Sequence, residues 1–299
     1  MKDYVAEFES RISKIDEESK SVNIINAGVM NHGKSSLFNS LLDNYCFAAQ
    51  DVRTTVDYEK IKWMDDVYLV DTPGLGAEES DDDAAFEAYR VANAVVFVHT
   101  VKVGELRKNE LDAINKIKSL FSDDEFFKKH FCLVLTFMDS DSDGNIKTIR
   151  KKTLKDIENH CGIKDFKTFM VSNSRYQKGL MENKVNMIKK SGIPELRKYL
   201  FDNFGVWREE NVVMRAVRLN RTKNESISAL RKEQFEVNQK MAEKISKLEN
   251  EQKDFLAKLG YAIEDYYSDV EEYETATERL EEMKNELSAL KNRWNNERY

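Results

Sequence analysis

Residues 28–35, GVMNHGKS, combine residue types that could bind a phosphate group. The segment fits the pattern G-x-x-x-x-G-K-[ST] and lies between a predicted strand and a predicted helix. Its glycines let the backbone curl so that successive N–H groups and the helix N-terminus face a phosphate. Lys34 would reach the β- and γ-phosphate oxygens, and the Ser35 hydroxyl would bind Mg²⁺. The expected phosphate-binding residues are Gly28, Asn31, His32, Gly33, Lys34, Ser35 and Ser36.

A second motif, VDTPG, follows about forty residues downstream at the end of an apolar run. Asp71 could hold Mg²⁺ through a water, and the Gly74 N–H could contact the γ-phosphate. Between the two motifs, residues 51–57 contain a threonine that could complete the Mg²⁺ shell when the γ-phosphate is present. Thr55 is the first choice for this ligand and Thr54 the second. The alternative is that both are ordinary threonines at a strand edge with no role in metal binding. The expected metal ligands are Ser35, Thr55 and Asp71.

Two later segments could recognise a base. Residues 136–139, TFMD, lie where a guanine-nucleotide-binding protein carries [N/T]-K-x-D. Asp139 could accept hydrogen bonds from N1–H and N2–H₂ of guanine, a pair that adenine cannot offer. Phe137 replaces the usual lysine, and its ring could stack on the purine. We therefore favour guanine, with Thr136, Asp139 and a loop containing Ser172 and Asn173 around it.

Alternating strands and helices are predicted to position these motifs. Five apolar runs predict buried strands, at residues 22–29, 67–72, 94–100, 131–137 and 167–172. Four amphipathic segments predict helices, at residues 35–42, 84–91, 106–121 and 148–160. The alternation indicates an α/β fold with a mostly parallel sheet and helices on both faces. Residues 58–63 could add an antiparallel edge strand.

The two ends of the chain are predicted to be helical. Residues 1–20 carry apolar side chains at helical spacing, residues 21–205 hold the motifs, and residues 206–299 form a helical region. A loose heptad pattern runs from residue 211 to residue 299, with Gly260 inside it. One unbroken helix and two antiparallel helices bending near Gly260 both fit this pattern. The region could pack only on itself, or could contact a partner or a membrane.

Composition excludes several classes of protein. The 299 residues contain 11 glycines and 2 prolines, too few for the turns of a large all-β fold. The net charge of −7 argues against general nucleic-acid binding. Three unpaired cysteines indicate reduced thiols and a cytoplasmic protein. The charged N-terminus predicts no signal peptide, and no apolar stretch is long enough to span a membrane.

In this order, the motifs resemble those of translation-factor-related GTPases over about residues 20–205. GVMNHGKSSLFNSLL resembles the phosphate loop of Era/TrmE-type enzymes. Other segments look more like small bacterial dynamin-like proteins. These are DTPGLG with the acidic loop after it, ANAVVFVHTVKVGELRKNELDAI, and GIPELRKYLFDNF before a long helical stalk. The resemblance implies a Ras-like P-loop GTPase fold that hydrolyses GTP to GDP with Mg²⁺. The region after the GTPase domain is shorter than in full dynamin-like proteins and shows no apolar paddle, which argues against membrane fission.

The resemblance also implies how catalysis would work. Leu75 follows Gly74 where Ras-like enzymes place a water-orienting glutamine, and related enzymes with this apolar replacement often use a monovalent cation. Asn31 is at the position of a K⁺ ligand, although an asparagine that only caps the loop is an equal alternative. Lys34, Asn31, Thr55 and Gly74 are the expected catalytic residues. His32 is expected to contribute only its backbone.

The remaining polar residues suggest no second site. His99, His130 and His160 are isolated in sequence from cysteine and carboxylate clusters, which argues against zinc. The acidic run at residues 78–83 is expected to be a solvated switch loop. Aromatic residues near Gly260 have acidic neighbours, which disfavours a lipid-binding tip and leaves peripheral membrane contact as a lesser alternative.

Three functions fit these features. The first is a GTPase that forms a homodimer, through its GTPase domains or its stalk, and couples hydrolysis to stalk movement. The second is a slow switch whose helical region binds a protein partner. The third is a scaffold with a degenerate nucleotide site.

Overall fold

The computed structural model describes residues 4–44, 46–47, 59–75, 79–140, 145–265 and 270–296. Thr54, Thr55 and Tyr58 lie outside these ranges, so the predictions that concern them stay predictions. The chain divides into two compact units, one ending at Lys223 and the other beginning at Asn224. The sequence predicts domain boundaries near residues 20 and 205, and these boundaries stay a prediction.

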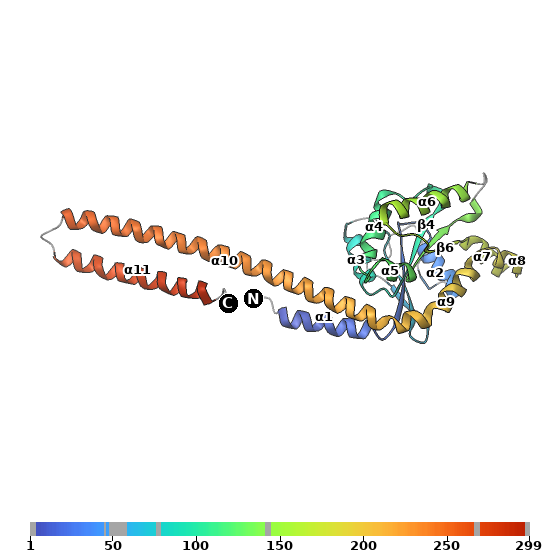
Figure 1. The fold of residues 1–299 in the computed structure, drawn as a ribbon, viewed down its shortest axis with the longest axis horizontal. Coiled ribbons are helices and arrows are strands. Elements are labelled where there is room, and N and C mark those ends of the chain that lie inside the picture. Colours follow the sequence, from blue (N-terminus) through green and yellow to red (C-terminus); the bar gives the residue numbers. More distant parts are fainter. Residues whose placement is uncertain are drawn as a thin grey trace. The chain divides into compact units, whose positions relative to one another are not determined.

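A six-stranded sheet lies at the centre of the first unit, in the order β2-β3-β1-β4-β5-β6 (Figure 1). Five strands run parallel, as predicted: β1 (Val22–Ala27), β3 (Val67–Asp71), β4 (Ala94–Thr100), β5 (Phe131–Thr136) and β6 (Lys167–Met170). The edge strand β2 (Glu59–Met64) pairs antiparallel with β3. The α/β fold class is therefore confirmed. Parallel strands share one direction, so the loops after β1, β3, β4, β5 and β6 meet at the same edge of the sheet.

Helices cover both faces of the sheet, as predicted. One face carries α3 (Glu79–Arg90), α4 (Lys108–Lys118) and α6 (Ile146–Cys161). The other carries α2 (Lys34–Leu42), α7 (Asn173–Met181) and α9 (Ile193–Glu209). The four predicted helices correspond to α2, α3, α4 and α6. The helices α7 and α9 were not predicted. Neither were the short helices α5 (Asp124–Lys129) and α8 (Val185–Lys189) or the 3-10 turns η1 (Val101–Val103) and η2 (Met138–Ser140).

The central strands are buried on both faces, which explains their apolar and β-branched composition. Every residue of β1, β4 and β5 is buried. Cys132, in β5, is one of them and packs in the core, and burial raises the pKa of its thiol. The expected loop at residues 78–83 is wrong in part, because α3 already begins at Glu79.

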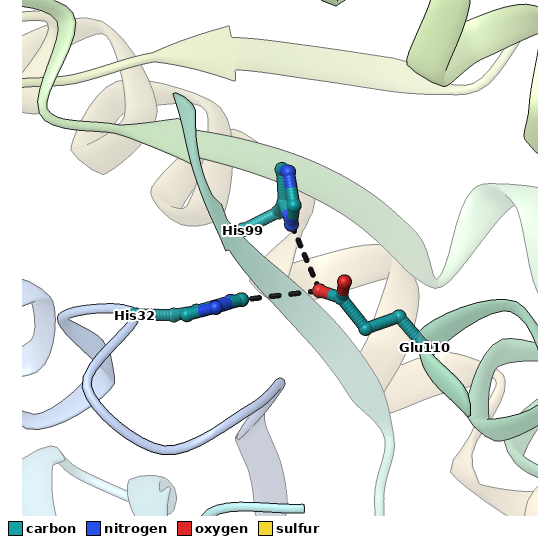
Figure 2. Close-up of side chains that lie close together, drawn as sticks. All are labelled: His32, His99 and Glu110. Atoms are coloured by element: carbon teal, nitrogen blue, oxygen red, sulfur yellow. Dashed lines mark hydrogen bonds and ion pairs between the residues drawn. The ribbon is translucent and has the colours of Figure 1, made fainter. Parts of the chain in front are cut away.

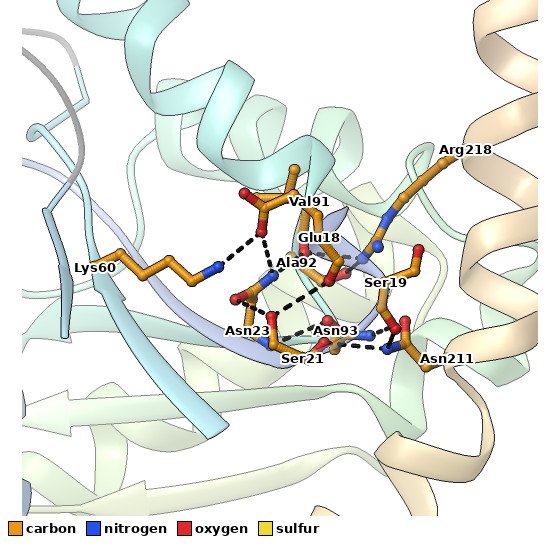
Figure 3. Close-up of polar contacts among 10 residues, drawn as sticks. All are labelled: Glu18, Ser19, Ser21, Asn23, Lys60, Val91, Ala92, Asn93, Asn211 and Arg218. Carbon is orange, nitrogen blue, oxygen red and sulfur yellow. Dashed lines mark hydrogen bonds and ion pairs between the residues drawn. The ribbon is translucent and has the colours of Figure 1, made fainter. Parts of the chain in front are cut away.

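The helix α1 (Tyr4–Glu18) and the first turns of α10 (Asn211–Asp265) pack at the end of the sheet where β1 and β4 begin (Figure 3). Asn211 donates hydrogen bonds to the carbonyl oxygens of Ser19 (2.6 Å) and Ser21 (3.1 Å). The Arg218 guanidinium, which is buried, donates to the carbonyl oxygens of Val91 and Ala92, both at 2.9 Å. These contacts explain why the first unit includes the beginning of α10.

The second unit contains the rest of α10 and the helix α11 (Val270–Asn296). The two helices run side by side in opposite directions (Figure 1), and Lys291 of α11 pairs with Glu249 of α10 at 2.8 Å. Of the two arrangements that the heptad pattern allowed, the structure therefore has the antiparallel pair. Gly260 does not break α10, which continues to Asp265.

Candidate nucleotide site

The phosphate loop, residues 28–35, connects β1 to α2. Gly28 has φ 141°, and a Cβ added there would lie 2.2 Å from the Val98 carbonyl oxygen, so only glycine fits. Gly33 precedes α2 with φ 86°, in the left-handed region. The loop also contacts the segment after β3, because the Leu75 N–H donates to the Gly28 carbonyl oxygen at 3.1 Å. The loop thus has the curled backbone that its sequence predicts.

Lys34 begins α2 and is buried, with only 6% of its surface exposed. Its ammonium group donates to the carbonyl oxygen of Val29 at 3.2 Å, within the loop itself. Burial lowers the pKa of Lys34 to about 8, although the negative charge of Asp71 acts in the opposite direction. A buried cation that is poorly solvated would be stabilised by a bound anion. This observation supports the prediction that Lys34 binds phosphate.

Ser35 and Asp71 supply two oxygens that meet beside Lys34. The Ser35 hydroxyl donates to the Asp71 carboxylate at 2.7 Å. Asp71 is buried, which raises its pKa, while hydrogen bonds from Asn26 and Ser35 oppose this increase. A hydroxyl beside a buried carboxylate is a suitable pair of ligands for Mg²⁺, which prefers oxygen. The donor set therefore fits the expected metal.

Asn26 is a residue that the sequence analysis missed. Its side-chain amide donates to Asp71, and its side-chain oxygen accepts from the Thr72 N–H at 3.0 Å. The Thr72 hydroxyl returns a hydrogen bond to the Asn26 carbonyl oxygen at 2.8 Å. These bonds orient the Asp71 carboxylate. A polar residue in the middle of a strand buried on both faces was the available signal.

Gly74 lies against the phosphate loop. A Cβ added there would lie 2.5 Å from Met30 Cα, so no side chain fits without moving the loop. This close approach is what the predicted contact between the Gly74 N–H and a γ-phosphate needs. Asn31 has φ 63° and an exposed side chain. Its predicted role in binding K⁺ stays a prediction.

The segments after β5 and β6, which are predicted to recognise a base, also lie beside the phosphate loop. Asp139 accepts a hydrogen bond from the Ser174 hydroxyl at 2.8 Å. Partial burial opposes ionisation of Asp139, but hydrogen bonds from Ser172 and Ser174 lower its pKa below the ordinary value. An ionised carboxylate is an acceptor only, which suits two N–H donors of guanine.

Thr136 makes a contact with the phosphate loop, and its expected role in nucleotide binding stays a prediction. Its hydroxyl is buried and donates to the His32 carbonyl oxygen at 2.8 Å, so it joins β5 to the phosphate loop. The Asn173 amide makes a similar contact with the Gly33 carbonyl oxygen at 3.4 Å. Both residues therefore position the loop through its backbone.

Phe137, at the position of the usual lysine, has φ 60° and is partly buried. The Lys102 ammonium lies 3.8 Å from the centre of its ring, a cation–π contact. Lys102 comes from η1, after β4, and no feature of the sequence connected it with Phe137. A lysine is thus present beside this motif, although it comes from another loop.

The expectation that His99 lies apart from carboxylates is wrong. His99, at the end of β4, lies 2.8 Å from Glu110 of α4, and His32 lies 3.5 Å from the same carboxylate oxygen (Figure 2). The three residues are far apart in sequence, and only the fold brings them together. His130 also has a carboxylate partner, Glu210, at 3.0 Å.

Residues 23–137 match the family model described as the 50S ribosome-binding GTPase. This match covers β1 to β5 and includes the phosphate loop, Asp71 and Gly74. Over these residues the chain has the fold of a P-loop GTPase. Asp139, Ser172 and Asn173 lie after the matched residues, so the match does not test their predicted role in binding a base.

An uncharacterized protein of Acinetobacter baylyi is 34% identical over 176 residues, which are 58% of this chain and 40% of that protein. The match therefore spans less than half of the relative's length. Among solved structures, a chain of an oligomerised bacterial dynamin pair, described as sensing and tethering membranes over long range, is 17% identical with a TM-score of 0.51. That similarity covers 88% of this chain and 50% of the other, and it shows a shared fold.

A variant of Era from Aquifex aeolicus, bound to GDP and aluminium fluoride, is 19% identical with a TM-score of 0.40, covering 57% of each chain. Among the described residues, no helix combines the length and apolar character needed to cross a membrane.

Proposed function

We propose that the protein binds GTP with Mg²⁺ and hydrolyses it to GDP and phosphate. The observation that carries this proposal is the meeting of Lys34, Ser35 and Asp71 at one buried point of the GTPase domain. Asp139, at the same edge of the sheet, supports guanine as the base. A nucleotide lying between these two points would have its phosphates at the start of α2 and its base near Ser174.

Each residue has a role that its surroundings support. Lys34 would pair with the phosphate oxygens and stabilise the negative charge that develops on them. Ser35 and Asp71 would hold Mg²⁺, with Thr55 as a further proposed ligand. Mg²⁺, when bound, neutralises phosphate charge. Gly74 leaves room for its N–H to approach the γ-phosphate.

Among the described residues, the position after Gly74 does not supply a group that could orient the attacking water. Leu75 replaces a glutamine and is buried, and its side chain has no group that can orient a water. Another group therefore has to orient the water or stabilise the charge that develops on the phosphates. We propose either K⁺ bound through Asn31 or a facing GTPase domain of a second copy.

We further propose that GTP hydrolysis is coupled to movement of the helical stalk. It is supported by α10, which begins with buried contacts in the first unit and continues into the second. The alternatives stay a slow switch whose helical pair binds a protein partner and a scaffold with a degenerate site. The buried Lys34 counts against the scaffold, because burying an ammonium with no ligand to bind is costly.

Turnover of GTP and of ATP against protein concentration, in K⁺ and in Na⁺, tests the proposal, with Lys34→Ala as the blank. Turnover of GTP alone, at a specific rate that rises with concentration, is the expected result. Slow turnover at a constant specific rate would favour the switch. Absence of binding to either nucleotide would leave the scaffold. Vesicle sedimentation with the same protein tests peripheral membrane contact.

A further inference from the structure

His32, His99 and Glu110 form a buried cluster beside the phosphate loop (Figure 2). They come from the loop, the end of β4 and the first turn of α4. Each exposes 6% or less of its surface. One ligand atom from each residue lies within 4.8 Å of the other two. No part of the proposed GTPase chemistry uses these side chains.

The His99 ring is oriented by a backbone carbonyl. Its Nε2 lies 2.9 Å from the Gly104 carbonyl oxygen, which can only accept, so Nε2 carries a proton. The other nitrogen, Nδ1, lies 2.8 Å from Glu110 Oε1. Histidines that bind metals usually donate one ring N–H to a carbonyl or carboxylate in this way, which fixes the ring and leaves the other nitrogen to bind the metal.

The His32 ring is also hydrogen-bonded to the backbone, but one of its nitrogens has no hydrogen-bond partner among the described residues. It forms a hydrogen bond with the backbone of Val98. Its Nδ1 is buried without a hydrogen-bond partner among the described residues, and it lies 3.5 Å from Glu110 Oε1. Burial lowers the pKa of His32 to about 4, so the ring is neutral at physiological pH. A buried nitrogen facing a carboxylate oxygen at this distance is stabilised by a cation placed between them.

The Glu110 carboxylate is held in position for two histidines. Its Oε2 accepts the Arg107 N–H at 3.0 Å, which fixes the carboxylate and leaves Oε1 facing both rings. An ion pair between His99 and Glu110 would explain why these two side chains are buried together. It would not explain why His32 Nδ1 points into the same space.

We infer that His32, His99 and Glu110 form a binding site for one divalent transition metal of the zinc class. Two imidazole nitrogens and one carboxylate oxygen are a ligand set that zinc accepts, with a fourth position left for a water or another ligand. A metal here would connect the phosphate loop to β4 and α4. The site does not depend on nucleotide binding, so it can be tested separately from the proposed GTPase activity.

The test uses the full chain, stripped of metal with a chelator and titrated with Zn²⁺ and with Co²⁺. Calorimetry gives the stoichiometry, and the visible absorption of Co²⁺ reports tetrahedral coordination by nitrogen and oxygen. We expect one Zn²⁺ per chain. His32→Asn and Glu110→Gln should each weaken binding by at least about tenfold, because each removes a direct ligand.

His160→Asn is the matched control, because His160 is exposed and distant in sequence from the cluster. It should bind Zn²⁺ as the parent chain does. Ser35→Ala should also retain binding, which separates this site from the Mg²⁺ ligands. Zn²⁺ should raise the unfolding temperature of the parent chain and of both controls, but not that of His32→Asn.

The inference is overturned if the parent chain binds no Zn²⁺, or if His32→Asn and His160→Asn bind it equally. If Glu110→Gln fails to fold, as judged by circular dichroism, the comparison of His32→Asn with His160→Asn decides the question alone. A cluster without metal would then be a buried ion pair that holds the phosphate loop in place.

Discussion

Ser35 and Asp71 lie 36 positions apart in the sequence, and a hydrogen bond of 2.7 Å joins their side chains. The bond connects the first turn of α2 to the end of β3, so the two motifs that predict a nucleotide site form one structural unit. Asn26 fixes Asp71 from the opposite side. The proposed binding of Mg²⁺ would replace a contact between two ligands that are already close together.

The choice of base should depend on Asp139. Asp139→Asn should weaken GTP binding by roughly 100-fold or more, because an amide cannot accept from both N–H groups of guanine. The same variant should gain affinity for XTP, since an amide can donate to the C2 carbonyl of xanthine while its oxygen accepts from N1–H. Calorimetry with both nucleotides measures the exchange. Asp112→Asn, on an exposed position of α4, is the control. A variant that binds both GTP and XTP more weakly than the parent chain would contradict the role of Asp139 in recognising guanine.

A monovalent cation should affect turnover through Asn31. GTP turnover should be faster in K⁺ than in Na⁺, because K⁺ bound beside the phosphate loop adds positive charge where negative charge develops. Asn31→Ala should remove this difference, whereas Asn186→Ala, at an exposed position in α8, should keep it. Steady-state phosphate release in the two salts is the measurement. The K⁺ role is rejected if the parent chain turns over equally fast in both.

His32 should make stability depend on pH. Its folded pKa, about 4, lies below the ordinary value of 6.5 because the ring is buried. The negative charge of Glu110 opposes this decrease, whereas His99 and Lys34 add to it. Between these values the unfolded chain binds a proton that the folded chain does not, so the free energy of unfolding falls as pH falls from 6.5 toward 4. At pH 5 this effect reaches at most about 2 kcal/mol.

His32→Gln has no charge to gain and should lose that part of the pH dependence. Urea unfolding at pH 7 and pH 5, without added metal, measures the difference between the two proteins. A parent chain and a His32→Gln variant with the same change in stability would show that His32 is not buried as a neutral ring.

Two glycine substitutions should have opposite effects. Gly28→Ala places a Cβ 2.2 Å from the Val98 carbonyl oxygen at a φ of 141°, so we expect a loss of about 1–3 kcal/mol in stability and weaker nucleotide binding. Gly205, inside α9, has open space around it, so Gly205→Ala should stabilise the protein by up to about 1 kcal/mol. Thermal unfolding of both variants measures this. If Gly28→Ala unfolds at the same temperature as the parent chain, the loop is less tightly packed against β4 than the structure shows.

The strands and the phosphate loop were predictable because their signals are local. Each strand is a short apolar run, and the loop motif specifies glycine, lysine and serine within eight positions. The antiparallel pair of helices was only one of two arrangements, because a heptad pattern does not show whether a helix continues or turns. Gly260 was a weak signal, since a single glycine inside a long helix costs only about 1 kcal/mol.

Contacts between separate loops could not be predicted. His32, His99 and Glu110 belong to three elements, and each looks isolated when only its sequence neighbours are considered. Lys102 and Phe137 meet because η1 and the loop after β5 lie at the same edge of the sheet. The hydrogen bond from the Thr136 hydroxyl to the His32 carbonyl oxygen likewise joins two separate loops. Such pairings depend on the order of the strands, which no single segment encodes.

The central claim is that the site around Lys34, Ser35 and Asp71 binds GTP. Calorimetric titration of the metal-free chain with GTP and with ATP, each with and without Mg²⁺, tests it most directly. Lys34→Ala is compared with Lys116→Ala, an exposed lysine of α4. We predict Mg²⁺-dependent binding of GTP in the parent chain and Lys116→Ala, its loss in Lys34→Ala, and weak or absent ATP binding. GTP binding that survives Lys34→Ala unchanged, or a parent chain that binds neither nucleotide, would contradict the account.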